Sequence, residues 1–254
     1  MRFPSVINYN LGDGIRAFTT TRGELTHAEN PYSGFSVCHY VGDNDSHIAR
    51  CRQLLADHIN IPQNQIIIPR QTHSANVAII TDIPTNGCSL ENVDALVTSL
   101  SGVALCINTA DCIPILLADS TSGIIAAVHS GWRGTIANIT AKTIDAMMEI
   151  GANPERIQAA MGPSICTSCF EVGEEVADIF LTEFPQRTDI VDLSHPRPHI
   201  NLAAAVHQTL LDKKIAAEHI ALPPVCSKCN PQEFFSARHL GINSGRTLSL
   251  IYRL

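Results

Sequence analysis

Four short apolar runs that follow one another between residues 94 and 129 constrain the fold of this chain more than any other feature. The runs cover residues 94–99, 103–108, 113–119 and 123–129, and each is rich in β-branched and aliphatic side chains, as strands are. Only three or four residues separate one run from the next. A parallel crossover needs about a dozen residues, so the sequence excludes a simple doubly wound fold here and favours a mixed or largely antiparallel sheet.

The remaining periodic segments complete the prediction of one α+β domain over residues 1–254, with helices covering the outside of the sheet structure. The helical segments have apolar residues at three- and four-residue spacing. We expect further strands at residues 15–21, 65–69, 76–81, 157–162 and 247–252, and helices at residues 45–60, 135–150, 171–183 and 201–213.

Composition and charge exclude several classes of function. The 254-residue chain has a net charge of −7 and no block of five like charges, which argues against binding to nucleic acid or to an anionic membrane. The first ten residues lack the apolar stretch of a signal peptide, and no apolar run is long enough to span a bilayer. We therefore expect a cytoplasmic protein, a monomer or small homo-oligomer, whose nine cysteines are reduced thiols or metal ligands.

Three residues that follow or end strand-like runs are candidate metal ligands. His73, Cys112 and His129 supply two imidazoles and one thiolate, a donor set that binds catalytic zinc and leaves a position for water or substrate. Taken singly, each residue has an ordinary alternative, because a lone histidine at a strand end is usually a surface residue and a lone cysteine in an apolar run is usually core. The three are far apart in sequence, so the fold must bring them together.

Residues 131–135, with the sequence Gly-Trp-Arg-Gly-Thr, are a candidate anion site. A helix is predicted to begin here with Thr135 near its N-terminus, where free N–H groups bind anions. Arg133 can add a bidentate contact to a phosphate or carboxylate, and Arg22 can join from another strand end. The alternative is that Arg133 pairs with a surface acid while Trp132 fills a gap in the core.

Two CxxC pairs suggest a second metal site. Cys166 with Cys169, and Cys226 with Cys229, have the spacing of structural zinc sites, although the two pairs are far apart in sequence. A thioredoxin-type redox pair is disfavoured because neither pair opens a helix after a strand in a visible βαβ unit. Uncoordinated cysteines remain the alternative to a structural zinc ion.

The candidate metal ligands also lie within segments that resemble a known family. Residues 71–74 read Gln-Thr-His-Ser, residues 109–114 read Thr-Ala-Asp-Cys-Ile-Pro, and residues 129–134 read His-Ser-Gly-Trp-Arg-Gly. These segments resemble the YfiH family, also called laccase-domain or multicopper polyphenol-oxidase-like proteins and purine nucleoside phosphorylases. The resemblance runs through nearly the whole chain and includes Arg238 in a closing Phe-Ser-Ala-Arg segment, but the CxxC pairs are not part of the general family pattern.

The resemblance implies a fold, a cofactor and an activity. The fold would be layered α/β/β/α, with two sheets flanked by helices, and one zinc ion would be bound by His73, Cys112 and His129. The activity would be phosphate-dependent cleavage of adenosine, inosine or methylthioadenosine, together with hydrolytic deamination of adenosine. Arg22, Arg133, Thr135 and Arg238 would then bind phosphate or ribose oxygens, and Asp111 would either orient one of the histidines or act as a base.

Three other functions remain open at this point. The family is also associated with zinc-dependent editing of a peptidoglycan precursor (a UDP-MurNAc-amino acid) by amide cleavage, which would use the same ligands. Its older label implies copper and polyphenol oxidation, but a laccase centre needs histidines in paired spacing and the chain has no HxH sequence. A non-enzymatic zinc-stabilised binding protein would need a closed, four-ligand site.

Overall fold

Two stacked β-sheets form the centre of the molecule. The computed structural model describes residues 2–25, 30–83 and 90–254. The first sheet has five strands in the order β1-β2-β13-β6-β3, and the second has six in the order β12-β9-β7-β8-β5-β4. Only β3–β6, β12–β9 and β4–β5 are parallel neighbours within them, so both sheets are mixed and largely antiparallel, as predicted.

The strands of the two sheets are β1 (Val6–Tyr9), β2 (Ile15–Thr20), β3 (Ile66–Ile67), β4 (Val77–Ile80), β5 (Ala95–Thr98), β6 (Ala104–Thr109), β7 (Ile113–Asp119), β8 (Ile124–Ser130), β9 (Gln158–Met161), β12 (Ile220–Ala221) and β13 (Thr247–Arg253). A small separate pair is formed by β10 (Val191–Asp192) and β11 (His199–Ile200).

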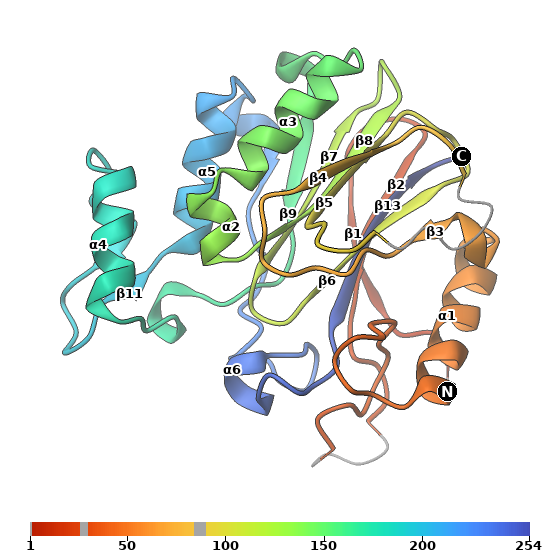
Figure 1. The fold of residues 1–254 in the computed structure, drawn as a ribbon, viewed down its shortest axis with the longest axis horizontal. Coiled ribbons are helices and arrows are strands. Elements are labelled where there is room, and N and C mark those ends of the chain that lie inside the picture. Colours follow the sequence, from red (N-terminus) through yellow and green to blue (C-terminus); the bar gives the residue numbers. More distant parts are fainter. Residues whose placement is uncertain (1, 26–29, 84–89) are drawn as a thin grey trace.

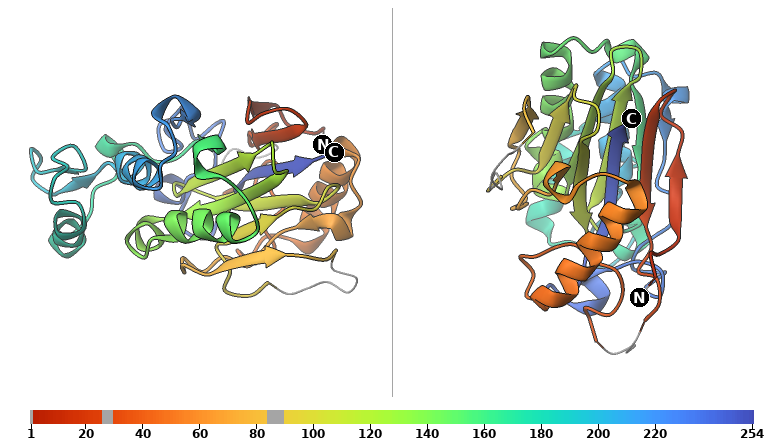
Figure 2. Two further views of the ribbon diagram at one scale, coloured as in Figure 1. Left: turned by 90° about the horizontal axis from the view of Figure 1, so that it is seen from above. Right: turned by 90° about the vertical axis from the view of Figure 1, so that its right-hand side faces the viewer.

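Helices cover the outer faces of both sheets and produce the expected α/β/β/α layering. Helix α1 lies on the outer face of the first sheet, whereas α3 and α5 lie on the other side of the molecule, over the second sheet (Figure 1). Helix α4 lies at the far end of the molecule from α1 (Figure 2). The helices are α1 (Asp45–Ile59), α2 (Trp132–Ile136), α3 (Ile139–Glu149), α4 (Glu174–Glu183), α5 (Leu202–Asp212) and the short α6 (Ala237–Leu240). None of the helices in the described residues combines the length and the apolar character that a membrane span requires.

Alternation along the central strands explains why they read as unbroken apolar runs. In β6, Leu105 and Ile107 pack between the two sheets, while Cys106 packs towards α1. In β7, Leu116 packs between the sheets, while Ile115 packs towards the helices on the second sheet. Because both faces of these strands are covered, each strand is apolar on both faces.

Two connections carry the chain from the first sheet to the second. The chain leaves β6 in the first sheet, turns through residues 110–112, and enters β7 in the second. The connection from β3 to β4, residues 68–76, makes the same crossing. The four consecutive runs between residues 94 and 129 are all strands, as predicted, but β6 pairs with β13 and β3 instead of with its neighbours in sequence.

The helix predicted over residues 135–150 is two helices. Asn138 adopts a left-handed conformation with φ of 61° and separates α2 from α3, a conformation that asparagine tolerates better than most residues. Gly131 caps α2, so Thr135 is the fourth helical residue and not the first. This shift changes what Thr135 can do, as described below.

Candidate metal centre

The fold brings His73, Cys112 and His129 together. One ligand atom from each lies within 4.8 Å of the others, and Cys112 Sγ is 3.7 Å from His73 Nε2. Cys112 directly precedes β7 and His129 lies in β8, and the antiparallel register pairs Ile113 with Ser130. The hairpin thus places the thiol beside the end of β8, and the loop between β3 and β4 adds His73.

Asp94 organises two of the three candidate ligands, and sequence reasoning missed it. Its carboxylate accepts a hydrogen bond from His129 Nδ1 at 2.7 Å and three from the backbone N–H groups of residues 72–74. These bonds hold His73 in a left-handed conformation with φ of 62°. A carboxylate on Nδ1 leaves Nε2 of His129 as the atom available to a metal, the arrangement typical of metal-binding histidines. The available sequence signal was an acidic residue at the start of an otherwise apolar strand.

Gln71 ties the His73 loop to the first sheet. Its side-chain amide donates to the carbonyl of Asn108 and accepts from the N–H of the same residue, both at 2.8 Å. Gln71 is buried, so this pair of bonds is shielded from water. The Gln-x-His spacing therefore has a structural reason, because the glutamine anchors the loop that presents the histidine.

The neighbouring ionisable groups of the site shift one another's pKa values. Burial alone would raise the pKa of Cys112, but the charge and hydrogen bonds of His129, with a hydrogen bond from His73, outweigh it and hold this pKa at about 6. Burial alone would lower the pKa of His129, but Cys112 and Asp94 raise it to about 9. For Asp94, the hydrogen bonds from His129 and Ser74 outweigh burial and lower the pKa to about 2. The site thus favours a thiolate, the form that binds metal.

Gly131 allows the ligands to approach the start of α2. A Cβ atom on this residue would lie 2.8 Å from Cys112 Sγ, closer than these atoms can pack, and 3.0 Å from His73 Cδ2, a very tight contact. The donor set and this close approach both fit a metal ion bound by His73, Cys112 and His129.

Asp111 lies next to Cys112, but its carboxylate points to other partners. It accepts hydrogen bonds from Ser227 Oγ and from the backbone N–H of Arg238, each at 2.7 Å. The hydrogen bond to a histidine that was considered for Asp111 is made by Asp94 instead. Asp111 has a φ of 86°, so these bonds stabilise a turn that most residues disfavour.

The predicted anion-binding residues Arg133 and Thr135 differ in their exposure and in their hydrogen-bond partners. Arg133 is exposed, its guanidinium lies 4.2 Å from the Trp132 ring centroid, and within the described part of the chain it makes no hydrogen bond through its side chain. Thr135 is buried and uses both its groups locally, because its N–H and its hydroxyl each donate to the carbonyl of Gly131. The start of α2 therefore does not present Thr135 to an anion.

The two other predicted arginines are held by the protein. Arg22 is buried, and its three guanidinium nitrogens donate to the carbonyls of Ser33 and Pro231. Arg238 is exposed and, among the described residues, donates one side-chain hydrogen bond, to the carbonyl of Glu171. Counting only partners in residues 2–25, 30–83 and 90–254, Arg238 has donors left for a ligand and Arg22 has none.

The four cysteines of the CxxC pairs also come together. Cys166, Cys169, Cys226 and Cys229 have their sulfur atoms within 4.8 Å of one another, so the described residues contain two clusters that could hold a metal ion.

Comparison with known proteins places the chain in one family. Residues 16–254 match the family described as multi-copper polyphenol oxidoreductase laccase. The crystal structure of a Bacillus licheniformis hypothetical protein YfiH superposes with a TM-score of 0.91 at 25% identity, covering 99% of this chain and 97% of that one.

Two relatives have names that state an activity. Adenosine deaminase RL5, from an unknown prokaryotic organism, is 45% identical over 250 residues, 95% of each chain. A purine nucleoside phosphorylase of Bacteroides thetaiotaomicron is 38% identical over 245 residues, covering 92% of this chain and 90% of the relative. On the matched length, the fold and the shared identity, the chain belongs to the YfiH family of laccase-like proteins.

Proposed function

We propose that this protein is a zinc-dependent purine nucleoside phosphorylase that acts on adenosine, inosine and methylthioadenosine and also deaminates adenosine. The observation that carries the proposal is the convergence of His73, Cys112 and His129 on one point. The names of the relatives, adenosine deaminase and purine nucleoside phosphorylase, supply the substrate class.

The donor set supports zinc at this centre. Two imidazoles and one thiolate bind catalytic zinc and leave one position for a substrate. His73 is exposed and Cys112 is half-buried, so a nucleoside can reach the centre. When bound, the zinc ion supplies Lewis-acid chemistry at that remaining position. Copper, which the family description names, is the alternative, but the chain lacks the paired histidines of a laccase centre.

Phosphorolysis joins a phosphate oxygen to C1′ of the ribose and breaks the bond from C1′ to the purine nitrogen. The products are ribose 1-phosphate and the base, which leaves with a proton. Arg133 is suited to hold the phosphate because its guanidinium is exposed and lies two residues after Gly131, the residue that packs against the ligands. Arginine binds phosphate through two parallel hydrogen bonds.

The remaining residues have supporting roles in this proposal. Arg238 has free side-chain donors and adjoins Asp111 through its backbone, so it is a second candidate for substrate oxygens. Asp111 positions Cys112 by fixing the turn that precedes it. Arg22 and Thr135, whose polar groups are already paired, stabilise the surrounding loops, so we no longer place them at the anion.

Product analysis by mass spectrometry tests the proposal. Zinc-loaded protein is incubated with adenosine, with and without phosphate, beside the Cys112→Ala variant. The matched control is Cys106→Ala, since Cys106 is buried in β6 and packs towards α1. We expect adenine and ribose 1-phosphate only when phosphate is present, and inosine in both reactions, with all turnover lost in Cys112→Ala and retained in Cys106→Ala.

Two results would contradict the proposal. Turnover that survives in folded Cys112→Ala would place the reaction elsewhere. No turnover of adenosine by the zinc-loaded wild type would contradict the proposal and favour the amide-cleaving and binding alternatives.

A further inference from the structure

Four cysteines outside the proposed catalytic centre form a separate cluster. The sulfur atoms of Cys166, Cys169, Cys226 and Cys229 all lie within 4.8 Å of one another. The first three are half-buried and Cys229 is exposed. All four are free thiols, and the proposed reaction uses none of them.

The sheet topology explains why the two CxxC pairs meet. Strands β9 and β12 are parallel neighbours, and each is followed a few residues later by one pair. The parallel alignment continues beyond the strands as a bridge between Ser164 and Cys226, in which the N–H of Ser227 donates to the carbonyl of Ser164 at 3.0 Å. Two segments about 60 residues apart in sequence are thereby held in register.

Each pair forms a tight turn with its sulfur atoms on one side. After the first pair, the N–H groups of Cys169 and Phe170 both donate to the carbonyl of Cys166 at 3.0 Å. After the second pair, the N–H of Asn230 donates to the carbonyl of Cys226 at 3.2 Å. The two turns are thus built alike.

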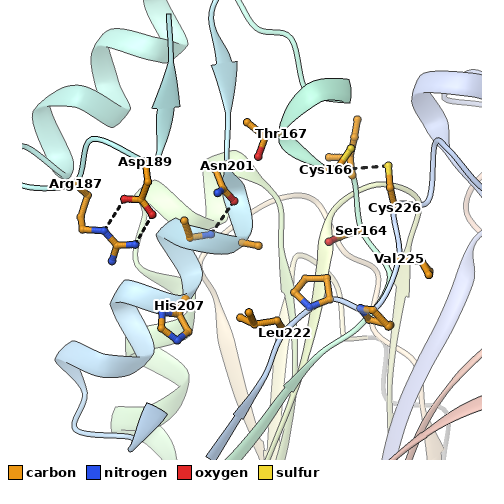
Figure 3. A pocket seen from close by; sticks show the side chains of 15 residues that line it. Ser164, Cys166, Thr167, Arg187, Asp189, Asn201, His207, Leu222, Val225 and Cys226 are labelled. Atoms are coloured by element: carbon orange, nitrogen blue, oxygen red, sulfur yellow. Dashed lines mark hydrogen bonds and ion pairs between the residues drawn. The ribbon is translucent and has the colours of Figure 1, made fainter. Parts of the chain in front are cut away.

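A hydrogen bond to sulfur links the two turns directly. The backbone N–H of Cys166 donates to Cys226 Sγ at 3.3 Å, and Figure 3 shows these two residues together at one edge of a cavity of about 540 Å³.

The distances match a tetrahedral metal site. Cys169 Sγ and Cys229 Sγ are 3.5 Å apart. Four sulfur atoms at the usual zinc–sulfur distance of about 2.3 Å lie about 3.8 Å apart along each edge of the tetrahedron. A disulfide would need a separation of about 2.05 Å.

We propose that Cys166, Cys169, Cys226 and Cys229 bind one zinc ion as a closed tetrathiolate site that is structural and separate from the centre at His73, Cys112 and His129. Four protein ligands leave no position for a substrate, so this ion takes no part in the reaction. It fixes the segment after β9 to the segment after β12.

This site also supports the neighbouring centre. Ser227 lies inside the second CxxC turn and donates its hydroxyl to Asp111 at 2.7 Å. Ile165, next to the first turn, donates its N–H to the carbonyl of Asp111 at 2.9 Å. Both turns therefore hold the residue that precedes Cys112, and loss of the second ion releases the Asp111 turn without removing a ligand from the first.

Metal stoichiometry tests the proposal. The wild type, produced with zinc and purified under reducing conditions, is weighed by native mass spectrometry and its metal content is determined by elemental analysis. We expect two zinc ions per chain. Cys169→Ser and Cys229→Ser should each lose one, and Cys112→Ser should lose the other. In the cobalt-substituted protein, the visible absorption of a tetrathiolate site should persist in Cys112→Ser and disappear in Cys169→Ser.

The wild-type measurement alone can overturn the proposal if both cysteine variants fail to fold. One zinc ion per chain in the wild type, with no cobalt tetrathiolate spectrum, excludes the second site. Two zinc ions that both persist in folded Cys169→Ser and Cys229→Ser would place the second ion elsewhere. Neither outcome depends on turnover, so the result is independent of the proposed activity.

Discussion

Asp94 and His129 form a buried pair in which the carboxylate accepts a 2.7 Å hydrogen bond from the imidazole Nδ1. They are joined a second time, because the N–H of His129 donates to the carbonyl of Asp94, also at 2.7 Å. Both side chains are at most 5% exposed. The orientation of His129 is therefore set by the protein before any metal arrives.

Replacing Asp94 should weaken metal binding. In Asp94→Asn one oxygen becomes an NH₂ group, which cannot accept a hydrogen bond. The variant therefore loses either the bonds that Oδ1 accepts from His73 N–H and His129 Nδ1 or those that Oδ2 accepts from the N–H groups of Thr72 and Ser74. We expect zinc affinity to fall about 10- to 100-fold, measured by competition with a chromogenic chelator. Asp82→Asn, at an exposed position, is the control, and equal affinities in the two variants would show that Asp94 does not orient the ligands.

A methyl group at position 131 should disturb the same centre sterically. In Gly131→Ala the new Cβ would lie 2.8 Å from Cys112 Sγ, so the ligands must move. We expect zinc affinity to fall at least tenfold, a loss of about 1.4 kcal/mol. Gly134→Ala is the matched control, since its Cβ would lie no closer than 3.3 Å to a neighbour, and it should bind zinc like the wild type.

Removing the Gln71 side chain should destabilise the fold and the His73 loop together. Gln71→Ala leaves the N–H and carbonyl of buried Asn108 without the partners they have now. An unsatisfied buried group costs about 1 to 3 kcal/mol, which urea unfolding of the metal-free protein would detect. Gln63→Ala, at an exposed position, should change stability by less than about 0.5 kcal/mol; a similar loss in both variants would argue against the anchoring role.

Asp119 should make stability depend on pH in the acid range. Its buried carboxylate accepts hydrogen bonds from Arg156 and from the N–H of Asn153. Burial opposes ionisation, but these bonds outweigh it and lower the pKa to about 2, from an ordinary value of 3.8. Because the folded pKa lies below the unfolded one, the stabilisation is complete above about pH 5 and is lost progressively as the pH falls towards 2.

The Asp119→Asn variant separates this contribution from those of other acids. We expect the free energy of unfolding of the wild type to exceed that of the variant by about 2 kcal/mol at pH 6, and this difference to shrink as the pH falls from about 5 to 2. Denaturant unfolding at several pH values measures it. Asp13→Asn, at an exposed position, should run parallel to the wild type, and an Asp119→Asn curve parallel to the wild type would refute the assignment.

Removing the Arg133 side chain should raise KM for phosphate more than KM for the nucleoside. Its exposed guanidinium has no side-chain hydrogen bond among the residues described, and Arg133→Ala should therefore change stability by less than about 0.5 kcal/mol. We expect KM for phosphate to rise about tenfold or more, the loss expected from one charge-assisted contact of about 1.5 to 3 kcal/mol. Steady-state kinetics with adenosine held saturating measure this effect. Arg197→Ala, at an exposed position, is the control, and an unchanged KM for phosphate in Arg133→Ala would remove Arg133 from the anion site.

The elements of this fold were largely predictable because each strand and helix carries its own periodic pattern. The pairing of the strands was not predictable. Strand β6 pairs with β13 in the five-stranded sheet, whereas its neighbours in sequence, β5 and β7, lie in the six-stranded sheet, and no local sequence feature indicates this. The three candidate ligands were found by their chemistry and by a family resemblance. Asp94 escaped notice because its hydrogen bonds reach 20 to 35 residues along the chain.

The sequence did not show which polar groups the folded protein pairs internally. Thr135 looked available to an anion because the helix was expected to begin there, but α2 begins at Trp132 and the turn uses the threonine hydroxyl. Arg22 looked like a free charge at a strand end, but folding surrounds its guanidinium with carbonyl groups.

Two of the connections between the sheets meet at the candidate metal centre. His73 lies in the connection from β3 to β4, and Cys112 lies in the connection from β6 to β7. An ion bound by ligands in both connections would link them, and with them the two sheets, at this end of the sandwich. Sliding of one sheet over the other would move the ligands apart. A rigid sandwich would therefore favour binding of the ion, and the bound ion would in turn oppose sliding of the sheets.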